Sequence, residues 1–201
     1  MRYLYLIFIP AFMFAGCYTI IDGGDPPILD LSTPGRTLES LARVWNTTRS
    51  TDDYARLLST DYHFYFAPGD VGKRLKDGYI IPATWDKPED VHATANMFAP
   101  PSKGGAYDIS MDVMNSPDYD YDPGGTEFTA DPVTLQLYIW PEGPDFAYLA
   151  TGSFVFDFEK IDGLWLISGW HDSLEVDGSI SLTGDHVQEG ALGVWRAYYH
   201  P

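Results

Sequence analysis

The pattern that decides the fold stands in residues Leu38–Pro68, which read LESLARVWNTTRSTDDYARLLSTDYHFYFAP. Apolar side chains recur at spacings of three and four from Leu38 to Trp45, which predicts an amphipathic helix. Thr51 is placed to cap a short second helix, because the two aspartates that follow it favour a helix N-terminus. Alternation over Tyr62–Phe66 then predicts a strand whose first, third and fifth rings share one face. A helical hairpin therefore leads into a sheet.

A third helix is predicted after a long loop over residues 69–83. Asp86 and Glu89 have the spacing of a capping box, in which each side chain satisfies a backbone N–H at the start of a helix. We expect the buried face of this helix at Val91, Ala95 and Phe98. Paired prolines then end it.

The second half of the chain reads as a meander of strands. Alternating apolar residues predict four strands, over 107–113, 133–140, 146–158 and 164–171. Asp162-Gly163 joins the last two, and this dipeptide best fits a type I′ hairpin turn. Helices first and strands afterwards indicate an α+β fold, with three N-terminal helices packed on one face of a curved antiparallel sheet.

Composition excludes several classes of function. The 201 residues carry 12 Lys and Arg against 29 Asp and Glu, a formal net charge of −17. Such a surface repels phosphate backbones, so nucleic acid is not an expected partner. The 6 Trp, 14 Tyr and 11 Phe supply the buriable area of one folded domain rather than of a disordered chain. Because no phosphate loop, nucleophile elbow or metal-ligand spacing occurs, no cofactor and no metal are expected.

The N-terminus reads MRYLYLIFIPAFMFAGC and has the layout of a signal peptide, with one cation, an apolar run and small residues before Cys17. The run is shorter than the roughly 20 residues of a spanning helix, and Pro10 interrupts it. The single cysteine of the chain ends a segment that resembles the bacterial lipobox, Phe14-Ala15-Gly16-Cys17. Cys17 is therefore the predicted site of lipidation. An ordinary secretory signal followed by an unrelated cysteine is the alternative.

This interpretation divides the chain into three parts. Residues 1–16 are a lipoprotein signal peptide, 17–33 are the lipidated Cys17 with a flexible tether rich in Gly and Pro, and 34–201 are a single domain with a C-terminal extension. Two or three acyl chains anchor a protein stably in a membrane. Tyr18 stands where an Asp would mark retention at the inner membrane. We therefore expect a bacterial envelope lipoprotein at the outer membrane, facing the periplasm.

Three further segments point to a known fold: WDKPEDVHATANMF over Trp85–Phe98, LWLISGWHD over Leu164–Asp172, and GVWRAYYH near the C-terminus. Together with Leu38–Pro68 and the order of elements, they resemble the nuclear transport factor 2-like superfamily, also called SnoaL-like or cystatin-like, and bacterial lipoproteins within it. The resemblance implies a cone with an apolar interior that takes a small apolar ligand. It also implies a homodimer that forms through the sheet. The residues expected to line a ligand pocket are Trp45, Tyr54, Phe64, Phe98, Met111 and Trp170. The alternative is that these side chains fill a solid core.

Enzymes of this superfamily place their chemistry inside the cone. Isomerase members have a carboxylate before the proline that closes the first strand and a tyrosine on the first helix, whereas Ala67 and Arg43 stand there in this chain. Dehydratase-like chemistry needs a His/Asp pair, and the available residues are His63, His92, His171, Asp61, Asp108 and Asp172. His63 is the candidate base, although alternation sends it to the face opposite Phe64. His171 and Asp172 are adjacent on a strand, so they point to opposite faces.

Alternate aspartates in the segment DYDYDPGG resemble the start of a calcium loop, because Asp118, Asp120 and Asp122 could converge on a hard cation. Pro123 occupies the position where such a turn needs glycine. A solvated acidic loop is therefore the preferred interpretation.

The sequence supports two functional hypotheses. The first is a membrane-tethered, non-enzymatic domain that binds a small ligand or a protein through the cone mouth or the open sheet face. The alternative is a SnoaL-like lyase, isomerase or cyclase that acts on a small apolar substrate in the cone. The final residues, including 193–199, are expected to close the sheet edge or to lie along a partner.

Overall fold

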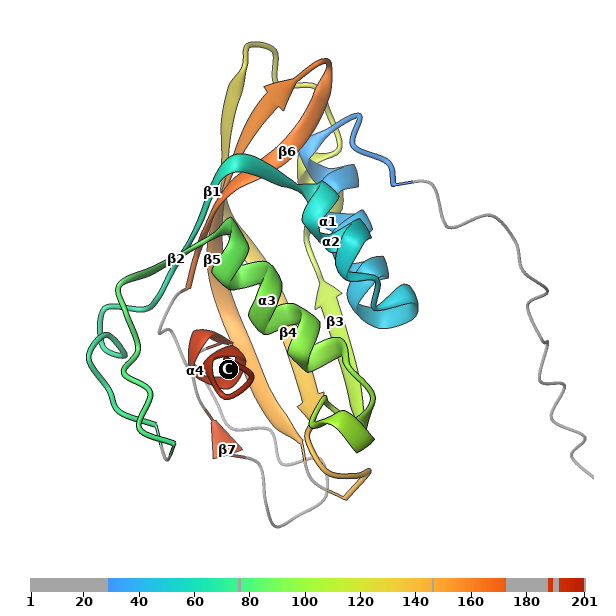
Figure 1. The fold of residues 1–201 in the computed structure, drawn as a ribbon. Coiled ribbons are helices and arrows are strands. Elements are labelled where there is room, and N and C mark those ends of the chain that lie inside the picture. Colours follow the sequence, from blue (N-terminus) through green and yellow to red (C-terminus); the bar gives the residue numbers. More distant parts are fainter. Residues whose placement is uncertain (1–28, 76, 146, 173–187, 190–191, 201) are drawn as a thin grey trace, which may run out of the picture.

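The computed structural model describes residues 29–75, 77–145, 147–172, 188–189 and 192–200, and the predicted signal peptide and Cys17 lie outside them. Helices cover one face of a curved, mixed sheet (Figure 1). The helical elements are α1 (Pro34–Arg43), the π-turn η1 (Val44–Thr48), α2 (Thr51–Leu57), α3 (Lys87–Phe98), the 3₁₀ turns η2 (Pro101–Lys103) and η3 (Ser116–Tyr119), and α4 (Leu192–Ala197). The strands are β1 (Leu58–Tyr65), β2 (Thr84–Asp86), β3 (Asp108–Val113), β4 (Glu127–Trp140), β5 (Tyr148–Ile161), β6 (Leu164–His171) and β7 (Gln188–Glu189).

Side-chain caps fix where the first helices begin. Thr33 accepts a hydrogen bond from the Arg36 N–H at 3.2 Å and starts α1. Ser50, not Thr51, caps α2, because the Ser50 hydroxyl accepts from the Asp53 N–H at 3.1 Å. The predicted cap of α2 was therefore one residue late.

The capping box of α3 is confirmed. The Asp86 carboxylate accepts from the Glu89 N–H at 3.0 Å, and the Glu89 carboxylate accepts from the Asp86 N–H at 3.1 Å. The predicted buried face was rotated, because the fully buried residues of α3 are Asp90, Ala93, Thr94 and Met97. An aspartate thus stands on the apolar face.

The strands order as β2-β1-β6-β5-β4-β3, with β7 beside β5. The β5–β6 hairpin has the predicted turn, since Asp162 and Gly163 both adopt positive φ, 52° and 83°. The sheet is mixed rather than purely antiparallel, because β1 and β6 run parallel. The other pairings along this order are antiparallel, between β1 and β2 and from β3 through β4 and β5 to β6. The parallel pairing places Phe64 beside Trp170 at the centre of the sheet.

The packed domain extends beyond its predicted start. Leu31 is buried, and its carbonyl accepts from the Trp165 N–H at 2.8 Å. Asp30 is held by Ser40 of α1 through two hydrogen bonds. Residues 29–33, assigned from sequence to the tether, therefore lie on the domain. In the described part of the chain, no helix combines the length and apolar character needed to cross a bilayer.

Candidate functional site

Aromatic rings from four elements meet between the helices and the sheet. Strand alternation turns Tyr62 and Phe64 of β1 inward, and Trp170 of β6 lies beside Phe64 with ring centroids 5.8 Å apart. The π-turn η1 carries Trp45. The Trp45 ring lies edge-on to that of Tyr54 of α2, with centroids 6.1 Å apart, and its centroid is 6.3 Å from that of Trp170. These rings form the interior of the cone.

The six predicted pocket residues largely converge there. Trp45, Tyr54, Phe64 and Trp170 are each 0% exposed. Phe98 is half-buried and packs against Trp45 at 5.5 Å, while Met111 of β3 is buried in the same core. Whether they bind a ligand stays a prediction.

The C-terminal helix α4 supplies a cation to this interior. Arg196 is 1% exposed, and its guanidinium carbon lies 4.7 Å from the Phe64 ring centroid and 5.2 Å from that of Trp170. The ring centroids of Trp45 and Trp85 lie 5.6 and 5.9 Å from the same guanidinium carbon. Four π faces thus surround a buried positive charge, a favourable arrangement when the cation is desolvated.

An acidic side chain from α3 neutralises that charge. Arg196 Nη2 donates to Asp90 Oδ1 at 2.5 Å, and both side chains are at most 1% exposed. The same nitrogen contacts the Thr94 hydroxyl at 3.0 Å and the Tyr54 hydroxyl at 3.2 Å. Tyr54 in turn donates to Asp90 Oδ2 at 2.5 Å. We call Tyr54, Asp90, Thr94 and Arg196 the interior network.

Burial sets the protonation states of the interior network. Desolvation raises the pKa of Asp90 above its ordinary value, although Arg196 opposes this rise. Desolvation by itself would lower the pKa of Arg196, but the Asp90 carboxylate raises it overall. Desolvation also raises the pKa of Tyr54, so its phenol stays protonated and can donate to Asp90. Arg196 is therefore a fixed cation and not a proton carrier.

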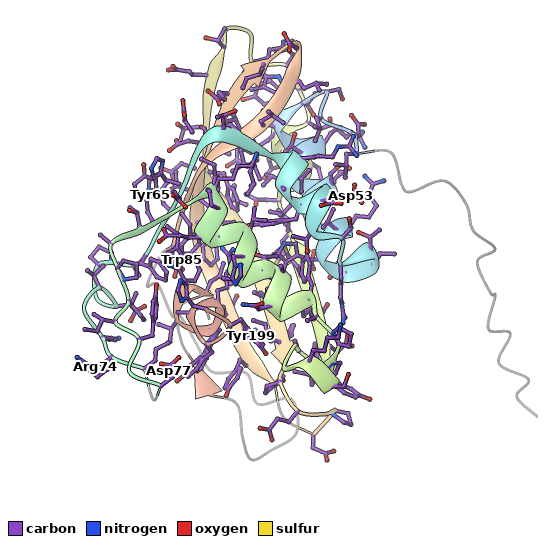
Figure 2. All side chains as sticks on the ribbon, in the orientation of Figure 1. Asp53, Tyr65, Arg74, Asp77, Trp85 and Tyr199 are labelled. Carbon is purple, nitrogen blue, oxygen red and sulfur yellow. The ribbon has the colours of Figure 1, made fainter. Side chains whose placement is uncertain are left out.

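Packing at both ends of α4 holds Arg196 in place. The Gly193 N–H donates to Asp172 Oδ2 at 2.7 Å, and a Cβ at Gly193 would lie 2.6 Å from Phe66 Cδ1. At the other end, Asn96 Nδ2 donates to the Tyr199 carbonyl at 2.9 Å. Figure 2 shows Tyr199 beside α4, with Trp85 on the opposite side of that helix. The helix therefore packs against α3 and β5 with Arg196 in the interior, whereas the sequence suggested the sheet edge or a partner surface.

The histidines considered as bases lie outside this interior. His63 is exposed, and its Nδ1 contacts the Asp61 carbonyl at 3.0 Å. His92 is exposed on α3. His171 pairs with Asp157 at 2.7 Å, where both side chains are 38% exposed, and it stacks on Tyr65.

Of the aspartates considered with these histidines, Asp61 is exposed, and the side chains of Asp172 and Asp108 have structural partners. Asp172 is buried and accepts from Gly193, so it points to the face opposite His171, as expected. Asp108 forms an ion pair with Arg49. At the two positions that isomerases use, Ala67 is buried and Arg43 donates to the Ser40 hydroxyl at 3.2 Å.

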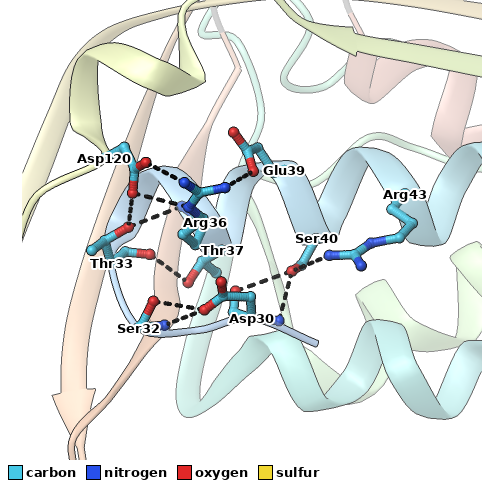
Figure 3. Close-up of polar contacts among 9 residues, drawn as sticks. All are labelled: Asp30, Ser32, Thr33, Arg36, Thr37, Glu39, Ser40, Arg43 and Asp120. Carbon is cyan, nitrogen blue, oxygen red and sulfur yellow. Dashed lines mark hydrogen bonds and ion pairs between the residues drawn. The ribbon is translucent and has the colours of Figure 1, made fainter. Parts of the chain in front are cut away.

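The three alternate aspartates do not converge. Figure 3 shows Asp120 bound by Arg36 at 2.6 Å and by the Thr33 hydroxyl at 2.9 Å, at the start of α1. Asp122 instead pairs with Lys160 at 2.6 Å. Across the described ranges, no group of three His, Cys, Asp or Glu side chains is placed to hold a metal. The acidic loop ties β5 and α1 together.

Asp90 and Arg196 were not predicted from the sequence. A signal for Asp90 existed, since it shares helical spacing with Ala93, Thr94 and Met97, and an acidic residue on an apolar face needs a buried partner. The partner is more than a hundred residues away in the chain, and no local pattern connects the two.

Comparisons with known proteins match this architecture. No protein-family model and no curated protein matches the sequence. A hexachlorocyclohexane dehydrochlorinase (LinA) type 2 aligns with a TM-score of 0.50 and 12% identity, over 76% of this chain and 88% of that one. A nuclear transport factor 2-like superfamily protein from Salmonella enterica serovar Typhimurium aligns with a TM-score of 0.46 and 10% identity, over 76% and 94%. The chain has an α+β fold, with helices on one face of a curved mixed sheet, that is similar to the fold of the dehydrochlorinase.

Proposed function

We propose that this chain is a lipid-anchored envelope protein whose nuclear transport factor 2-like domain binds a partner and does not turn over a substrate. The observation that carries the binding role is the ion pair of Arg196 with Asp90 at the centre of the cone. The superfamily resemblance implies that its enzymes hold their substrates inside the cone, and in this chain Arg196 and Asp90 stand in that interior. We therefore assign binding of the partner to the outer surface of the domain.

The anchor rests on the sequence. Cys17 ends a lipobox-like segment, and residues 18–28 would link it to the first packed residue, Leu29. The domain carries most of the acidic residues, so an anionic bilayer would repel it and the tether would hold it near the membrane. The outer membrane, facing the periplasm, is the proposed location.

The anchor is tested by membrane fractionation of the full chain and of Cys17→Ser. The expected result is that the native chain sediments with the outer membrane and the variant moves to the soluble fraction. Unchanged sedimentation of Cys17→Ser would refute lipid anchoring.

The proposal that the interior takes no ligand is tested with a lipophilic fluorophore. In the native chain Arg196 and the surrounding rings occupy the interior, so we expect no saturable uptake of the dye. Trp45→Ala shortens a fully buried side chain and is expected to create saturable uptake. Saturable uptake by the native protein would instead assign ligand binding to the cone.

One observation favours the alternative, a SnoaL-like lyase, isomerase or cyclase. Tyr54 and Asp90 form a 2.5 Å hydrogen bond inside the cone, and such pairs can support acid–base chemistry. The test is turnover of small cyclic ketones and phenols by the native chain and by Tyr54→Phe. Turnover that Tyr54→Phe abolishes, with the fold unchanged by circular dichroism, would establish the enzyme and overturn the proposed binding role.

A further inference from the structure

A groove of about 410 Å³ opens where α4, η2 and the turn between β4 and β5 meet. One of its lining residues, Tyr199, is labelled beside α4 in Figure 2. Its walls are mainly tyrosine rings and prolines with one carboxylate, from Pro101, Pro141, Glu142, Tyr148, Tyr198 and Tyr199. We call it the tyrosine groove. It is separate from the interior network.

Three nearly parallel rings form a platform along the tyrosine groove. The Tyr148 ring lies 4.0 Å from Trp195 and 6.3 Å from Tyr198, and Trp195 lies 5.7 Å from Tyr198, with interplanar angles of at most 16°. In a stack of three rings, the centroids of the two outer rings would be about 7 Å apart, twice the contact distance between carbon atoms. Every pair of centroids here is closer than that, so no ring lies between the other two, and the rings spread sideways into a surface. Trp195 is buried beneath it, and Tyr198 is 41% exposed.

The platform is held rigidly by the rest of the fold. Arg196, next to Trp195, is locked by Asp90, and the carbonyl of Tyr199 is held by Asn96. A binding surface that is already ordered loses little conformational entropy when a ligand arrives.

The charge of the tyrosine groove favours a cationic ligand. Glu142 is exposed at its rim, and among the described residues no Lys or Arg lines the groove. Burial raises the pKa of Tyr148, and the neighbouring Tyr198 hydroxyl and Glu142 carboxylate raise it further. The chain as a whole carries a net charge of −17. Electrostatic complementarity therefore selects a basic partner.

The chemistry of the walls distinguishes a peptide from a sugar. A saccharide presents many hydroxyl groups and needs several carboxylate or amide side chains, whereas Glu142 is the only such side chain among the described residues that line this groove. A polyproline II segment has flat apolar faces and suits grooves lined by aromatic side chains. Its residues i and i+2 border one face and lie about 6.2 Å apart along the axis. The Tyr148 and Tyr198 centroids are 6.3 Å apart.

We propose that the tyrosine groove binds an extended, proline-rich segment of a partner protein that carries a basic residue beside its prolines. The prolines lie on Tyr148 and Tyr198, and the basic side chain pairs with Glu142. This inference rests on the proposed function, because it names the partner that a non-enzymatic, surface-binding domain recognises.

The test is fluorescence anisotropy of a labelled twelve-residue peptide that repeats Pro-Pro-Arg, titrated with the full chain in detergent micelles. We expect saturable binding that weakens as salt is added. Tyr198→Ala is expected to weaken binding about tenfold, the usual effect of removing a central aromatic contact. Glu142→Gln is expected to weaken it several-fold and to reduce its salt dependence.

Matched controls lie far from the groove in the sequence and in the fold. Tyr121→Ala removes a 50% exposed tyrosine of the acidic loop, and Glu127→Gln neutralises an exposed glutamate at the start of β4. Neither is expected to change peptide affinity. Near-ultraviolet circular dichroism checks that the Tyr198 variant keeps its packing, and the isosteric Glu142 variant gives a second, independent measurement.

Several results would overturn the inference. These are no saturation with the Pro-Pro-Arg peptide, equal affinity for a Gly-Gly-Arg repeat, or equal affinity for a Pro-Pro-Glu repeat. Displacement of the peptide by chitohexaose or by tetramethylammonium at similar affinity would assign the groove to sugars or to small cations. The Cys17→Ser fractionation and the dye assay remain separate, so a failed peptide titration removes this ligand without removing the anchored binding domain.

Discussion

Replacing Arg196 with methionine keeps most of the apolar volume but removes the cation that faces Asp90, which is 0% exposed. Removing one partner of a buried ion pair lowers the free energy of unfolding by about 3–5 kcal/mol, because the remaining charge has neither water nor a partner. Tyr54 still donates to Asp90, which offsets part of this cost. We therefore expect Arg196→Met to lower the free energy of unfolding by about 4 kcal/mol.

Equilibrium urea unfolding near neutral pH measures this loss, provided that the denaturant dependence matches that of the native chain. Asp90→Asn is expected to cost a similar amount, since it leaves the guanidinium unneutralised. The double variant should cost less than the sum of the single changes by about 2–3 kcal/mol, as expected for residues in direct contact. Arg56→Met is the matched control, because Arg56 is 68% exposed and its ion pair with Asp53 is worth less than about 1 kcal/mol.

The pH dependence provides a further check with a defined sign. The pKa of Asp90 is already raised in the folded state, and removing Arg196 removes the interaction that opposed this rise. A group with a raised folded pKa gives stability that is present at low pH and lost as the pH rises through that pKa. The penalty of Arg196→Met should therefore shrink in mildly acidic buffer, where Asp90 is protonated. A cost below about 1 kcal/mol, or one that does not change with pH, would refute the account of the interior network.

Further measurements examine other parts of the fold. Burial raises the pKa of Tyr54 and Tyr62, so above about pH 10 the unfolded chain loses these phenol protons while the folded chain retains them. Each of the two groups should therefore lower stability by about 1.4 kcal/mol per pH unit in alkaline urea titrations. A flat alkaline limb would contradict this. Gly193→Ala should destabilise by about 1–3 kcal/mol, because its Cβ would meet Phe66 at 2.6 Å. An unchanged melting temperature would show that α4 can shift freely. Asp86→Ala should cost about 1 kcal/mol by removing the cap of α3, and Asp86→Asn much less.

Local rules predicted the elements of this chain well. The capping box at Asp86, the turn at Asp162-Gly163 and the inward face of β1 all follow from interactions within a few residues. The outward direction of His63 follows from the same alternation, and it argues against this histidine as a base inside the cone. Such features depend on short-range sterics and hydrogen bonds, which sequence spacing encodes directly.

Long-range features were less accessible. The parallel pairing of β1 with β6 depends on how the chain between them turns. The alternation of buried and exposed residues within each strand is the same for parallel and antiparallel pairing, so it does not show the relative direction of the two strands. The buried face of α3 was misassigned because Asp90 reads as a surface residue until its partner is known. That partner, Arg196, lies in a helix of six residues, which is too short for apolar periodicity to identify.

The sequence by itself determined the helical hairpin, the capping of α3, the strand meander and the α+β class, because each rests on periodicity and local turn chemistry. Its single cysteine also defined the one residue on which the proposed anchor depends. Only the tertiary structure decided that the cone is occupied by Arg196 and that the tyrosine groove exists. Both require α4 to pack against α3 and β5. Burying a charge inside a ring of aromatic side chains becomes favourable only when its carboxylate partner arrives from a distant element, so no local pattern could predict it.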